Sequence, residues 1–220
     1  SVIVSFDTNL FSNSEEAINC FNGQTIDNSS LEASPSSVTE TIKPSNSSVR
    51  VALTFDDGPS TTNTPKLLDG LKKRNTKATF FVLGNKAQNN PEIIKRIYDE
   101  GHEIGNHTVN HQHLNTATSE EINTQLVQTN DIIQSMTGFR PTIMRPPAGD
   151  YDQRLLSYGM KIILWSIDPR DWQTKNTQTS IDRIVPVAKN GDILLLHDTH
   201  QESVDAGLAV IDMLQAKGFQ

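Results

Sequence analysis

Apolar runs alternate with amphipathic stretches along most of this chain, from residue 49 onward. The apolar runs are typical of buried strands and cover residues 49–55, 78–83, 142–144, 161–167 and 192–197. Between them, apolar residues recur at helical spacing over residues 91–98, 118–136 and 204–214. Strands that alternate with helices predict parallel strands, and therefore an α/β sheet or barrel.

Local signals mark the ends of two of these helices. Asn90 followed by Pro91 predicts an N-cap with a proline in the first turn, and Gly101 predicts the end of that helix. Thr118 and Glu121 have the spacing of a capping box, in which each side chain satisfies a backbone N–H group of the other residue. We therefore expect helices to begin at residues 91 and 119.

The first 48 residues differ in composition from the rest of the chain. They are rich in Ser, Asn and Thr and poor in Lys and Arg, and residues 28–48 have no lasting period. This composition predicts a loosely structured linker or stalk, with weak strand and helix signals at residues 2–4 and 15–21. We expect one folded domain over residues 49–220. Because the chain stops just after a helix, we also expect this domain to lack its final strand.

Charge, hydropathy and cysteine content argue against a nucleic-acid partner, a membrane span and a disulfide framework. The net charge is −7, and Lys and Arg are scattered without a basic stripe, so a nucleic acid is not an expected partner. No apolar stretch reaches the roughly 18 residues that a membrane-spanning helix needs. The single cysteine, Cys20, excludes an internal disulfide framework. No oligomerisation signal is visible in the sequence, and we expect a monomer.

Carboxylates and histidines follow the predicted strands. Asp56 and Asp57 follow the first strand, His197 ends the last, and His107 and His111 lie four residues apart between them. In an α/β barrel, functional groups gather at the carboxyl ends of the strands. One Asp and two His form a facial ligand set for a divalent metal, and the other Asp and His can act as base and acid. This inventory predicts a metal-assisted hydrolase.

The two adjacent carboxylates are expected to have different roles. Neighbouring residues on an extended strand point to opposite sides, so one Asp can bind the metal while the other faces the substrate. Spacing alone does not say which of Asp56 and Asp57 is the base. Each motif taken singly also fits a structural role, such as a solvated turn or a core histidine, so the prediction depends on the whole set.

The loop after residue 144 contributes an arginine and a rigid turn. Arg145 can form a bidentate pair with a carboxylate and so fix the orientation of that group. The two prolines that follow stiffen the loop and can present the backbone N–H of Ala148 to an oxyanion. The structural alternative is a proline-rich surface turn with a solvated arginine.

Two further segments supply a carboxylate and apolar walls. Within residues 168–172, one of two carboxylates can accept a proton from a histidine ring and raise its basicity. Trp172 offers an apolar surface that suits the face of a sugar. Leu195 lies on the same strand face as His197 and can line a small pocket beside it.

Taken in order, these segments resemble the five motifs of the polysaccharide deacetylases, the NodB-homology group of carbohydrate esterase family 4. The five matching segments are residues 54–59, 107–111, 145–149, 168–172 and 195–197. Within the family, the chain is most similar to peptidoglycan N-acetylglucosamine deacetylases. The resemblance implies a distorted (β/α) barrel that forms the catalytic domain over residues 49–220. It also implies one divalent metal ion, zinc, with cobalt or nickel as alternatives.

The resemblance implies a role for each catalytic side chain. Asp56 would be the catalytic base, oriented by Arg145. His197 would be the general acid, tuned by Asp171. The metal ligands would be Asp57, His107 and His111.

The resemblance also implies contacts with the substrate. Trp172 and Leu195 would frame the pocket for the acetyl methyl group, and the backbone N–H of Ala148 would bind the oxyanion. The family usually has an aromatic residue or glycine at the position of Ala148, so this chain departs from the pattern there. The backbone contact is expected to survive this change, whereas a side-chain contact with the sugar is not.

Three functions are compatible with these motifs. The first is removal of N-acetyl groups from N-acetylglucosamine residues of a cell-wall glycan, peptidoglycan in particular. The second is O-acetyl esterase activity on xylan, or deacetylation of chitin oligomers, which the same site chemistry allows. The third is non-catalytic glycan binding, which would be favoured if a base, acid or metal ligand were missing. The stalk-like first segment favours a secreted or cell-surface protein.

Overall fold

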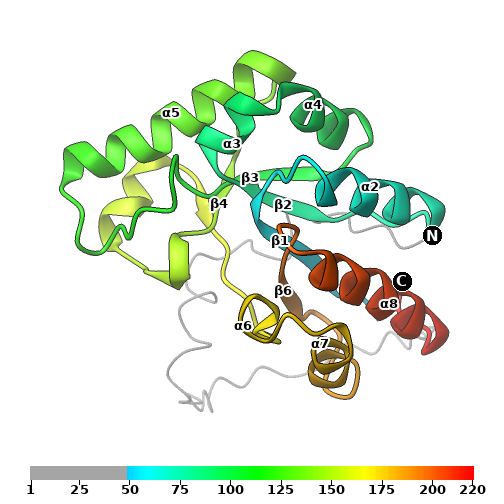
Figure 1. Cartoon of the computed structure of the whole chain (residues 1–220). Helices are drawn as coiled ribbons and strands as arrows, with labels where there is room; N and C mark the ends of the chain where they lie inside the picture. The colour runs from blue at the N-terminus through cyan, green and yellow to red at the C-terminus, as the bar shows by residue number, and fades with distance from the viewer. Residues whose placement is uncertain (1–48) are drawn as a thin grey trace, which may run out of the picture. The chain divides into compact units, whose positions relative to one another are not determined.

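The computed structural model describes residues 49–220 (Figure 1), so the predictions made for residues 2–4, 15–21 and 28–48 lie outside the described residues. The described elements are β1 (Ala52–Gly58), α2 (Asn63–Lys73), β2 (Thr79–Val82), α3 (Gly84–Asn89), α4 (Pro91–Asp99), β3 (Glu103–Asn106), α5 (Ser119–Thr137), β4 (Ile143–Met144), the 3₁₀ helices η2 (Pro147–Gly149) and η3 (Gln153–Tyr158), β5 (Lys161–Ile162), α6 (Asp171–Thr174), α7 (Thr177–Ile184), β6 (Ile193–His197) and α8 (Gln201–Ala216).

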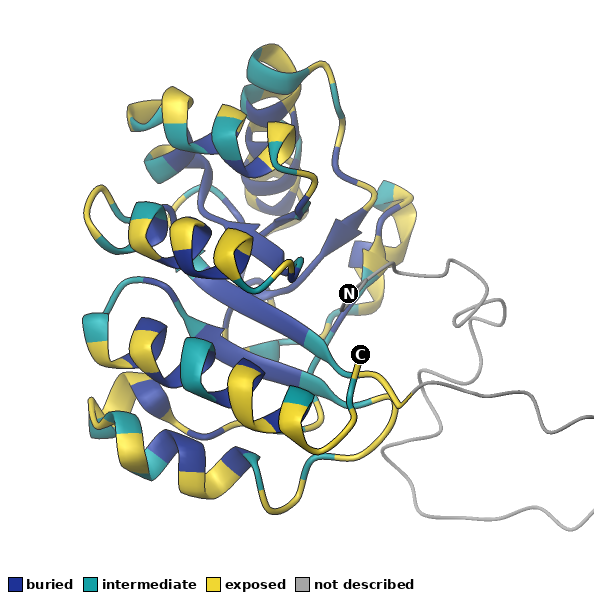
Figure 2. Cartoon of the chain, turned by 90° about the vertical axis from the view of Figure 1, so that its right-hand side faces the viewer, coloured by how far each residue is buried: buried dark blue, intermediate teal, exposed yellow. Residues whose placement is uncertain are grey.

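Six parallel strands form one curled sheet in the order β5-β4-β3-β2-β1-β6. Buried strands run through the middle of the domain, and helices cover the sheet with their exposed sides turned to solvent (Figure 2). The predicted α/β class and distorted barrel are confirmed. Among residues 49–220, no helix combines the length and apolar character that a membrane span requires.

The segment 161–167 spans the open side of the curl. Its first residues pair with β4, whereas Ile167 forms a bridge with Leu194 of β6 and its N–H donates to Ile193 O at 3.2 Å. The prediction of one continuous strand here is wrong, because the two ends of the segment pair with opposite edges of the sheet. A single strand cannot stay in register with both partners, so β5 covers only Lys161–Ile162.

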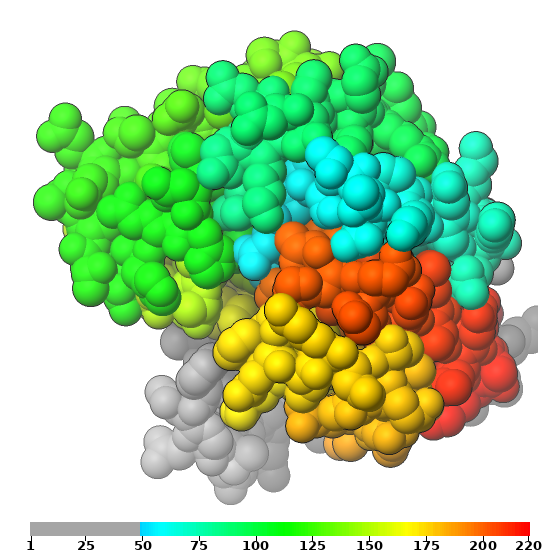
Figure 3. Space-filling model, viewed as in Figure 1, coloured from blue at the N-terminus to red at the C-terminus, as the bar shows by residue number. Residues whose placement is uncertain are grey.

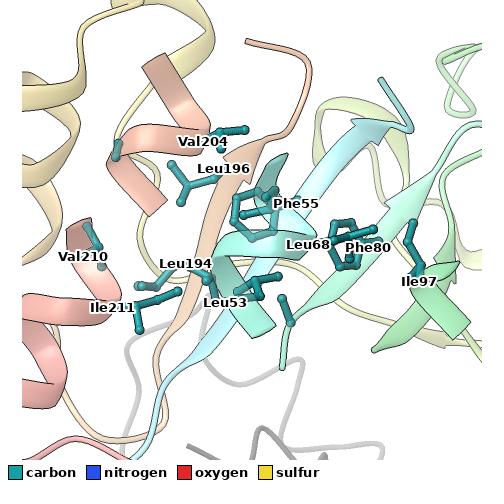
Figure 4. Close-up of a cluster of buried hydrophobic side chains, with 14 of the residues drawn as sticks. Leu53, Phe55, Leu68, Phe80, Ile97, Leu194, Leu196, Val204, Val210 and Ile211 are labelled. Atoms are coloured by element: carbon teal, nitrogen blue, oxygen red, sulfur yellow. The ribbon is translucent and has the colours of Figure 1, made fainter. Parts of the chain in front are cut away.

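Strand alternation divides β1 between an outer core and the interior of the curl. Leu53 and Phe55 point outward to the helices, and the Phe55 ring stacks on Phe80 with a centroid distance of 5.7 Å. Figure 4 shows this outer core, to which α8 adds side chains such as Val204. Thr54 and Asp56, which alternate with these two residues along β1, point to the inner side, where the polar groups of the site lie.

The predicted helices are confirmed as α4, α5 and α8, and the capping box of α5 is present. The N-cap expected at Asn90 is only partly right. Pro91 does begin α4, but the Asn90 side chain donates to Lys86 O at 2.8 Å instead of accepting from the helix. The hydrophobic pattern gives no prediction for β3, α2, α3, α6 or α7. The expected absence of a final strand stays a prediction.

Candidate metal centre and catalytic residues

The polar groups singled out in the sequence follow the carboxyl ends of β1, β3, β4 and β6. Asp56 and His197 are register partners in the neighbouring strands β1 and β6, so their side chains leave the sheet at the same level. In Figure 3 three segments adjoin one another at the surface: the one after β1 (cyan), the one after β6 (orange) and α6 (yellow). The fold therefore brings side chains from distant parts of the sequence to one edge of the sheet.

A β-bulge at the end of β1 redirects the second carboxylate. The register with β2 shifts between Asp56 and Gly58, and Asp57 has a left-handed φ of 69°. The expectation that the two carboxylates point to opposite sides is wrong for this reason. Both face the same histidine: His107 Nε2 lies 3.7 Å from Asp56 Oδ2 and 3.3 Å from Asp57 Oδ1.

The loop that carries His107 and His111 is held from α5. Val109 N–H donates to Gln125 Oε1 at 2.8 Å, and Thr108 N–H donates to the side chain of residue 106 at the end of β3. Both Thr108 and His111 have left-handed φ values, of 70° and 65°. These turns place the two imidazole rings edge to face with centroids 5.2 Å apart. The four-residue spacing thus closes within a tight loop rather than on a helix.

Asp57, His107 and His111 form a group that can hold a metal ion, since one ligand atom of each lies within 4.8 Å of the others. His107 Nδ1 donates to the carbonyl of Arg145 at 2.6 Å, which leaves an unprotonated Nε2 in the neutral ring. This lone pair faces Asp57 Oδ1, a buried oxygen that has no hydrogen-bond partner among the described residues. Two acceptors in contact repel each other unless a cation lies between them.

The spacing of these atoms also fits a small divalent cation. Asp57 Oδ1 lies 3.3 Å from His107 Nε2 and 3.4 Å from His111 Nε2. Donor atoms about 2.0–2.2 Å from a tetrahedral zinc ion lie roughly 3.3–3.6 Å apart. Burial disfavours the charged form of Asp57, but the three neighbouring histidines His107, His111 and His197, when protonated, outweigh it and lower the pKa of this carboxyl to about 2. The carboxylate is therefore ionised and ready to bind a cation.

Arg145 is a wholly buried cation that fixes Asp56. Its Nη1 donates to Asp56 Oδ1 at 2.7 Å and to Thr54 Oγ1 at 2.8 Å, while Nε donates to Ile163 O at 3.1 Å. The guanidinium lies 4.2 Å above the ring of Phe81. Arg145 therefore compensates the charge of Asp56. Its hydrogen bonds also connect β1 to the segment that spans the open side of the curl.

Asp171, rather than Asp168, pairs with the histidine at the end of β6. His197 Nδ1 donates to Asp171 Oδ1 at 2.9 Å, and His197 N–H donates to Asp171 Oδ2 at 2.8 Å. Burial opposes protonation of His197, but Asp171 and then Asp56 and Asp57 outweigh it and raise the pKa of His197 to about 9. Asp168 instead accepts from Arg170 N–H at 2.7 Å in an exposed turn. His197 is therefore protonated at neutral pH.

The three expected substrate-binding positions lie in different surroundings. Ala148 is exposed at the tip of the loop after β4, with a left-handed φ of 55°. Trp172 is half exposed and directly follows Asp171 in α6. Leu195 is buried on β6, in register with Thr54 of β1 and on the same strand face as His197. Their contacts with a substrate stay predictions.

Three polar residues of this region carry no individual signal in the sequence. His113 Nδ1 and Asp150 Oδ2 form a 2.5 Å ion pair that joins the loops after β3 and β4, and the His113 ring lies 6.3 Å from that of His111. Asp198 is wholly buried behind Gly58, and burial raises its pKa to about 6. The apolar run 192–197 indicates His197 as a functional residue. Only the fold shows that the carboxylate of the next residue, Asp198, lies behind Gly58.

A curled parallel α/β barrel with an Asp-His-His centre at the carboxyl ends of its strands defines the class of this protein. The sequence profile described as polysaccharide deacetylase matches residues 43–162. The chain is 42% identical to the peptidoglycan-N-acetylmuramic acid deacetylase of Bacillus subtilis and 38% identical to the peptidoglycan-N-acetylglucosamine deacetylase of Listeria monocytogenes. It belongs to the polysaccharide deacetylase family.

The two matches cover 77% and 78% of this chain but only 37% of each relative, so the chain spans a little over a third of their length. A shorter Bacillus cereus peptidoglycan-N-acetylglucosamine deacetylase is 36% identical, with 77% of this chain and 84% of that protein covered. The solved Bacillus subtilis peptidoglycan deacetylase superposes with a TM-score of 0.77 at 41% identity, covering 79% of this chain and 87% of that one.

A family 4 pseudoenzyme from Bacillus anthracis has the same fold. Its TM-score is 0.74 at 29% identity, with 79% of this chain and 63% of that chain covered. The fold of this family therefore does not by itself decide whether a member is an enzyme. That question depends on the individual side chains at the carboxyl ends of the strands.

Proposed function

We propose that this chain is a metal-dependent hydrolase that removes N-acetyl groups from N-acetylglucosamine residues of cell-wall peptidoglycan. The observation that carries the proposal is the pairing of two oriented groups across one centre. Asp56, fixed by Arg145, and His197, fixed by Asp171, leave neighbouring strands in register beside the candidate metal ligands. This arrangement supplies a base, an acid and a cation site at one place.

Asp56 is proposed as the general base. Its Oδ1 accepts from Arg145, which leaves Oδ2, 3.7 Å from His107 Nε2, directed toward the metal centre. This oxygen is the one placed to take a proton from a water that attacks the acetyl carbon. Because Arg145 is fixed by four hydrogen bonds, the carboxylate is held in one orientation before the substrate arrives.

His197 is proposed as the general acid. With Nδ1 donating to Asp171 and a pKa raised to about 9, the ring carries a second proton on Nε2 at neutral pH. An amide cannot expel its nitrogen at useful rates unless that nitrogen is protonated, whereas the alkoxide of an ester leaves with less help. A protonated and oriented acid therefore favours an amide substrate, an N-acetyl group, over an O-acetyl ester.

Asp57, His107 and His111 are proposed to hold one zinc ion, with cobalt or nickel as alternatives. One carboxylate and two imidazoles are ligands that zinc prefers, and three protein ligands leave room for water or substrate. When bound, such a cation supplies Lewis acidity that polarises the acetyl carbonyl and acidifies water. The backbone N–H of Ala148 is proposed as a further donor to the oxyanion.

Trp172 and Leu195 are proposed to limit the acyl group to acetyl. Leu195 is buried beside His197, and Trp172 offers a half-exposed apolar surface next to Asp171. In this proposal the two side chains frame the acetyl methyl group and leave no room for longer acyl chains. Because peptidoglycan lies outside the cell membrane, we also propose that the protein is secreted or held at the cell surface.

Acetate release from defined substrates tests the proposed function. Apo-protein loaded with zinc is incubated with purified peptidoglycan, and the glycan is then digested enzymatically, under conditions that keep N-acetyl groups, and analysed for de-N-acetylated glucosamine and muramic acid. We expect acetate together with glucosamine, and loss of both with Asp56→Asn. Muramic acid without glucosamine would move the activity to the other peptidoglycan sugar.

Two further outcomes would reject the deacetylase proposal. Turnover of acetylated xylan without turnover of peptidoglycan would favour an esterase, the alternative that the site chemistry also allows. Binding of peptidoglycan with no acetate from any substrate, at full zinc loading, would favour a non-catalytic glycan-binding protein. Chitin oligomers provide the third arm, since they carry N-acetylglucosamine without the lactyl ether and peptide of peptidoglycan.

A further inference from the structure

Asp198 is a buried carboxylate that the catalytic scheme above does not use. It directly follows His197, and its exposed fraction is 0%. Thr64 Oγ1 donates to Asp198 Oδ2, but Oδ1 has no hydrogen-bond partner among the described residues. A buried carboxylate with an unsatisfied oxygen is costly for stability.

Asp198 is in close contact with the turn that carries the proposed metal ligand Asp57. A Cβ atom on Gly58 would lie 2.4 Å from Asp198 Oδ1 and 2.5 Å from Oδ2, so only glycine allows this approach. Thr64 extends the contact, because its Oγ1 also accepts from Ser60 N–H at 2.7 Å. Asp198 thus contacts the turn directly at Gly58 and indirectly at Ser60.

The backbone of this turn is held from its other sides as well. Lys86 Nζ donates to Asp57 O at 2.8 Å, and Leu83 N–H donates to Gly58 O at 3.0 Å. Asp57 needs such support because a left-handed φ of 69° is uncommon for a residue with a side chain. A strained residue of this kind persists only where its surroundings hold it in place.

We propose that Asp198 is a positioning residue that holds the 57–60 turn so that the Asp57 carboxylate faces His107 and His111. In this role it sets the metal affinity of the centre without touching substrate. The proposal rests on the metal centre of the proposed function and deepens it. It explains why a costly buried carboxylate lies behind a glycine at this position.

Zinc affinity measured by chelator competition, without substrate, tests this role. Substitution of groups that orient metal ligands typically lowers affinity about 10- to 100-fold, and we expect at least a tenfold loss for Asp198→Ala. Asp212→Ala is the matched control, since it removes the same side chain from an exposed ion pair with Arg74. Unchanged zinc affinity in a folded Asp198→Ala protein would overturn the proposal.

Thr64→Val tests the same contact with less risk to folding. It removes the hydroxyl that joins Asp198 to Ser60 but keeps the side-chain shape, and we expect a smaller loss of zinc affinity in the same direction. It leaves His197 and its neighbours in sequence untouched. A loss seen with Asp198→Ala but absent with Thr64→Val would contradict a role for the link through Ser60 and leave only the direct contact at Gly58.

A double-mutant cycle with Gly58→Ala tests the direct contact. In the presence of Asp198 the added methyl group displaces the turn, so zinc affinity falls. In the Asp198→Ala background the space is free and the same methyl group should cost little. Strictly additive losses would show that the two positions do not interact.

The outcomes separate this proposal from the proposed function. If the wild-type protein binds zinc but releases no acetate from any glycan, the proposed function fails while the role of Asp198 can still hold. If Asp198→Ala keeps full zinc affinity, the role fails while the hydrolase proposal stands. A wild-type protein that binds no zinc, cobalt or nickel overturns both.

Discussion

Asp56 and His197 lie opposite each other at the ends of β1 and β6, as register partners in adjacent parallel strands. Each has its own charged partner, since Arg145 binds Asp56 from inside the curl and Asp171 binds His197 from α6. The two groups of an acid–base pair are thus fixed independently. Because Asp171 has the largest favourable effect on the pKa of His197 and the charge of Asp56 a smaller one, loss of Asp171 should change the protonation of His197 most.

The pH profile of kcat/KM tests the effect of Asp171 on His197. As the proposed general acid, His197 would act in its protonated form, and its pKa is raised to about 9, so activity should fall as pH rises through that value. Asp171→Asn removes the hydrogen bond and charge that raise this pKa, so the basic limb should move to lower pH by at least about one unit. Asp168→Asn, in the same loop, should leave the limb in place. An unmoved limb in Asp171→Asn would reject His197 as the acid.

Metal content should depend on three side chains and not on their neighbours. We expect one zinc ion per chain, with Asp57→Asn, His107→Gln or His111→Gln each abolishing tight binding. His113→Gln is the matched control, because its ring lies 6.3 Å from that of His111 but outside the ligand group. Elemental analysis after dialysis measures the stoichiometry. If Asp56→Asn lost the metal while Asp57→Asn kept it, the roles of the two carboxylates would be exchanged.

Arg145 should contribute strongly to stability. Arg145→Met leaves Asp56 as a buried charge without its cation, and such changes cost about 3–5 kcal/mol. Arg74→Met breaks an Arg–Asp pair of the same 2.7 Å length whose aspartate is 55% exposed, and should cost less than about 1 kcal/mol. Urea unfolding of the metal-free proteins measures both changes. Equal losses for the two variants would contradict the importance given to burial.

His102 should make the fold sensitive to acid. Burial, with a smaller contribution from the charge of Lys77, lowers the pKa of His102 from 6.5 to about 4. The unfolded chain then takes up a proton before the folded one, so the free energy of unfolding falls as pH drops from 6.5 to 4, by roughly 2–3 kcal/mol.

The comparison that isolates this effect uses His102→Gln. The glutamine cannot titrate and can still accept from Ala78 N–H, as His102 Nδ1 does at 3.2 Å. Its unfolding free energy should change less than that of the wild-type protein between pH 7 and pH 4.5. His113→Gln, at an exposed histidine, serves as control and should follow the wild type. A wild-type curve parallel to that of His102→Gln would contradict the prediction.

Local patterns in the sequence were enough to predict β1, β2, β4 and β6, three of the helices and the positions of the polar motifs, but not β3, which has no apolar run. The reason is that a buried strand shows as an apolar run, and a helix as apolar residues on one face, whatever their partners are. The capping box of α5 depends on residues three apart, so it too is readable from the sequence. The ordered motifs then identified the family and proposed a role for each residue at the site.

Tertiary structure alone decided how these pieces meet. Segment 161–167 has one apolar pattern, yet its ends pair with β4 and β6, because pairing depends on distant edges of the sheet. The bulge at Asp57 places two neighbouring carboxylates before one histidine, although strand alternation alone would separate them. Residue spacing left Asp168 and Asp171 equivalent until the family resemblance named Asp171, and the contact of Asp171 with His197 is seen only in the fold. The position of Asp198 behind Gly58 likewise depends on a contact between residues far apart in the chain. Such contacts leave no local period in the sequence, since they are set by the packing of the whole domain.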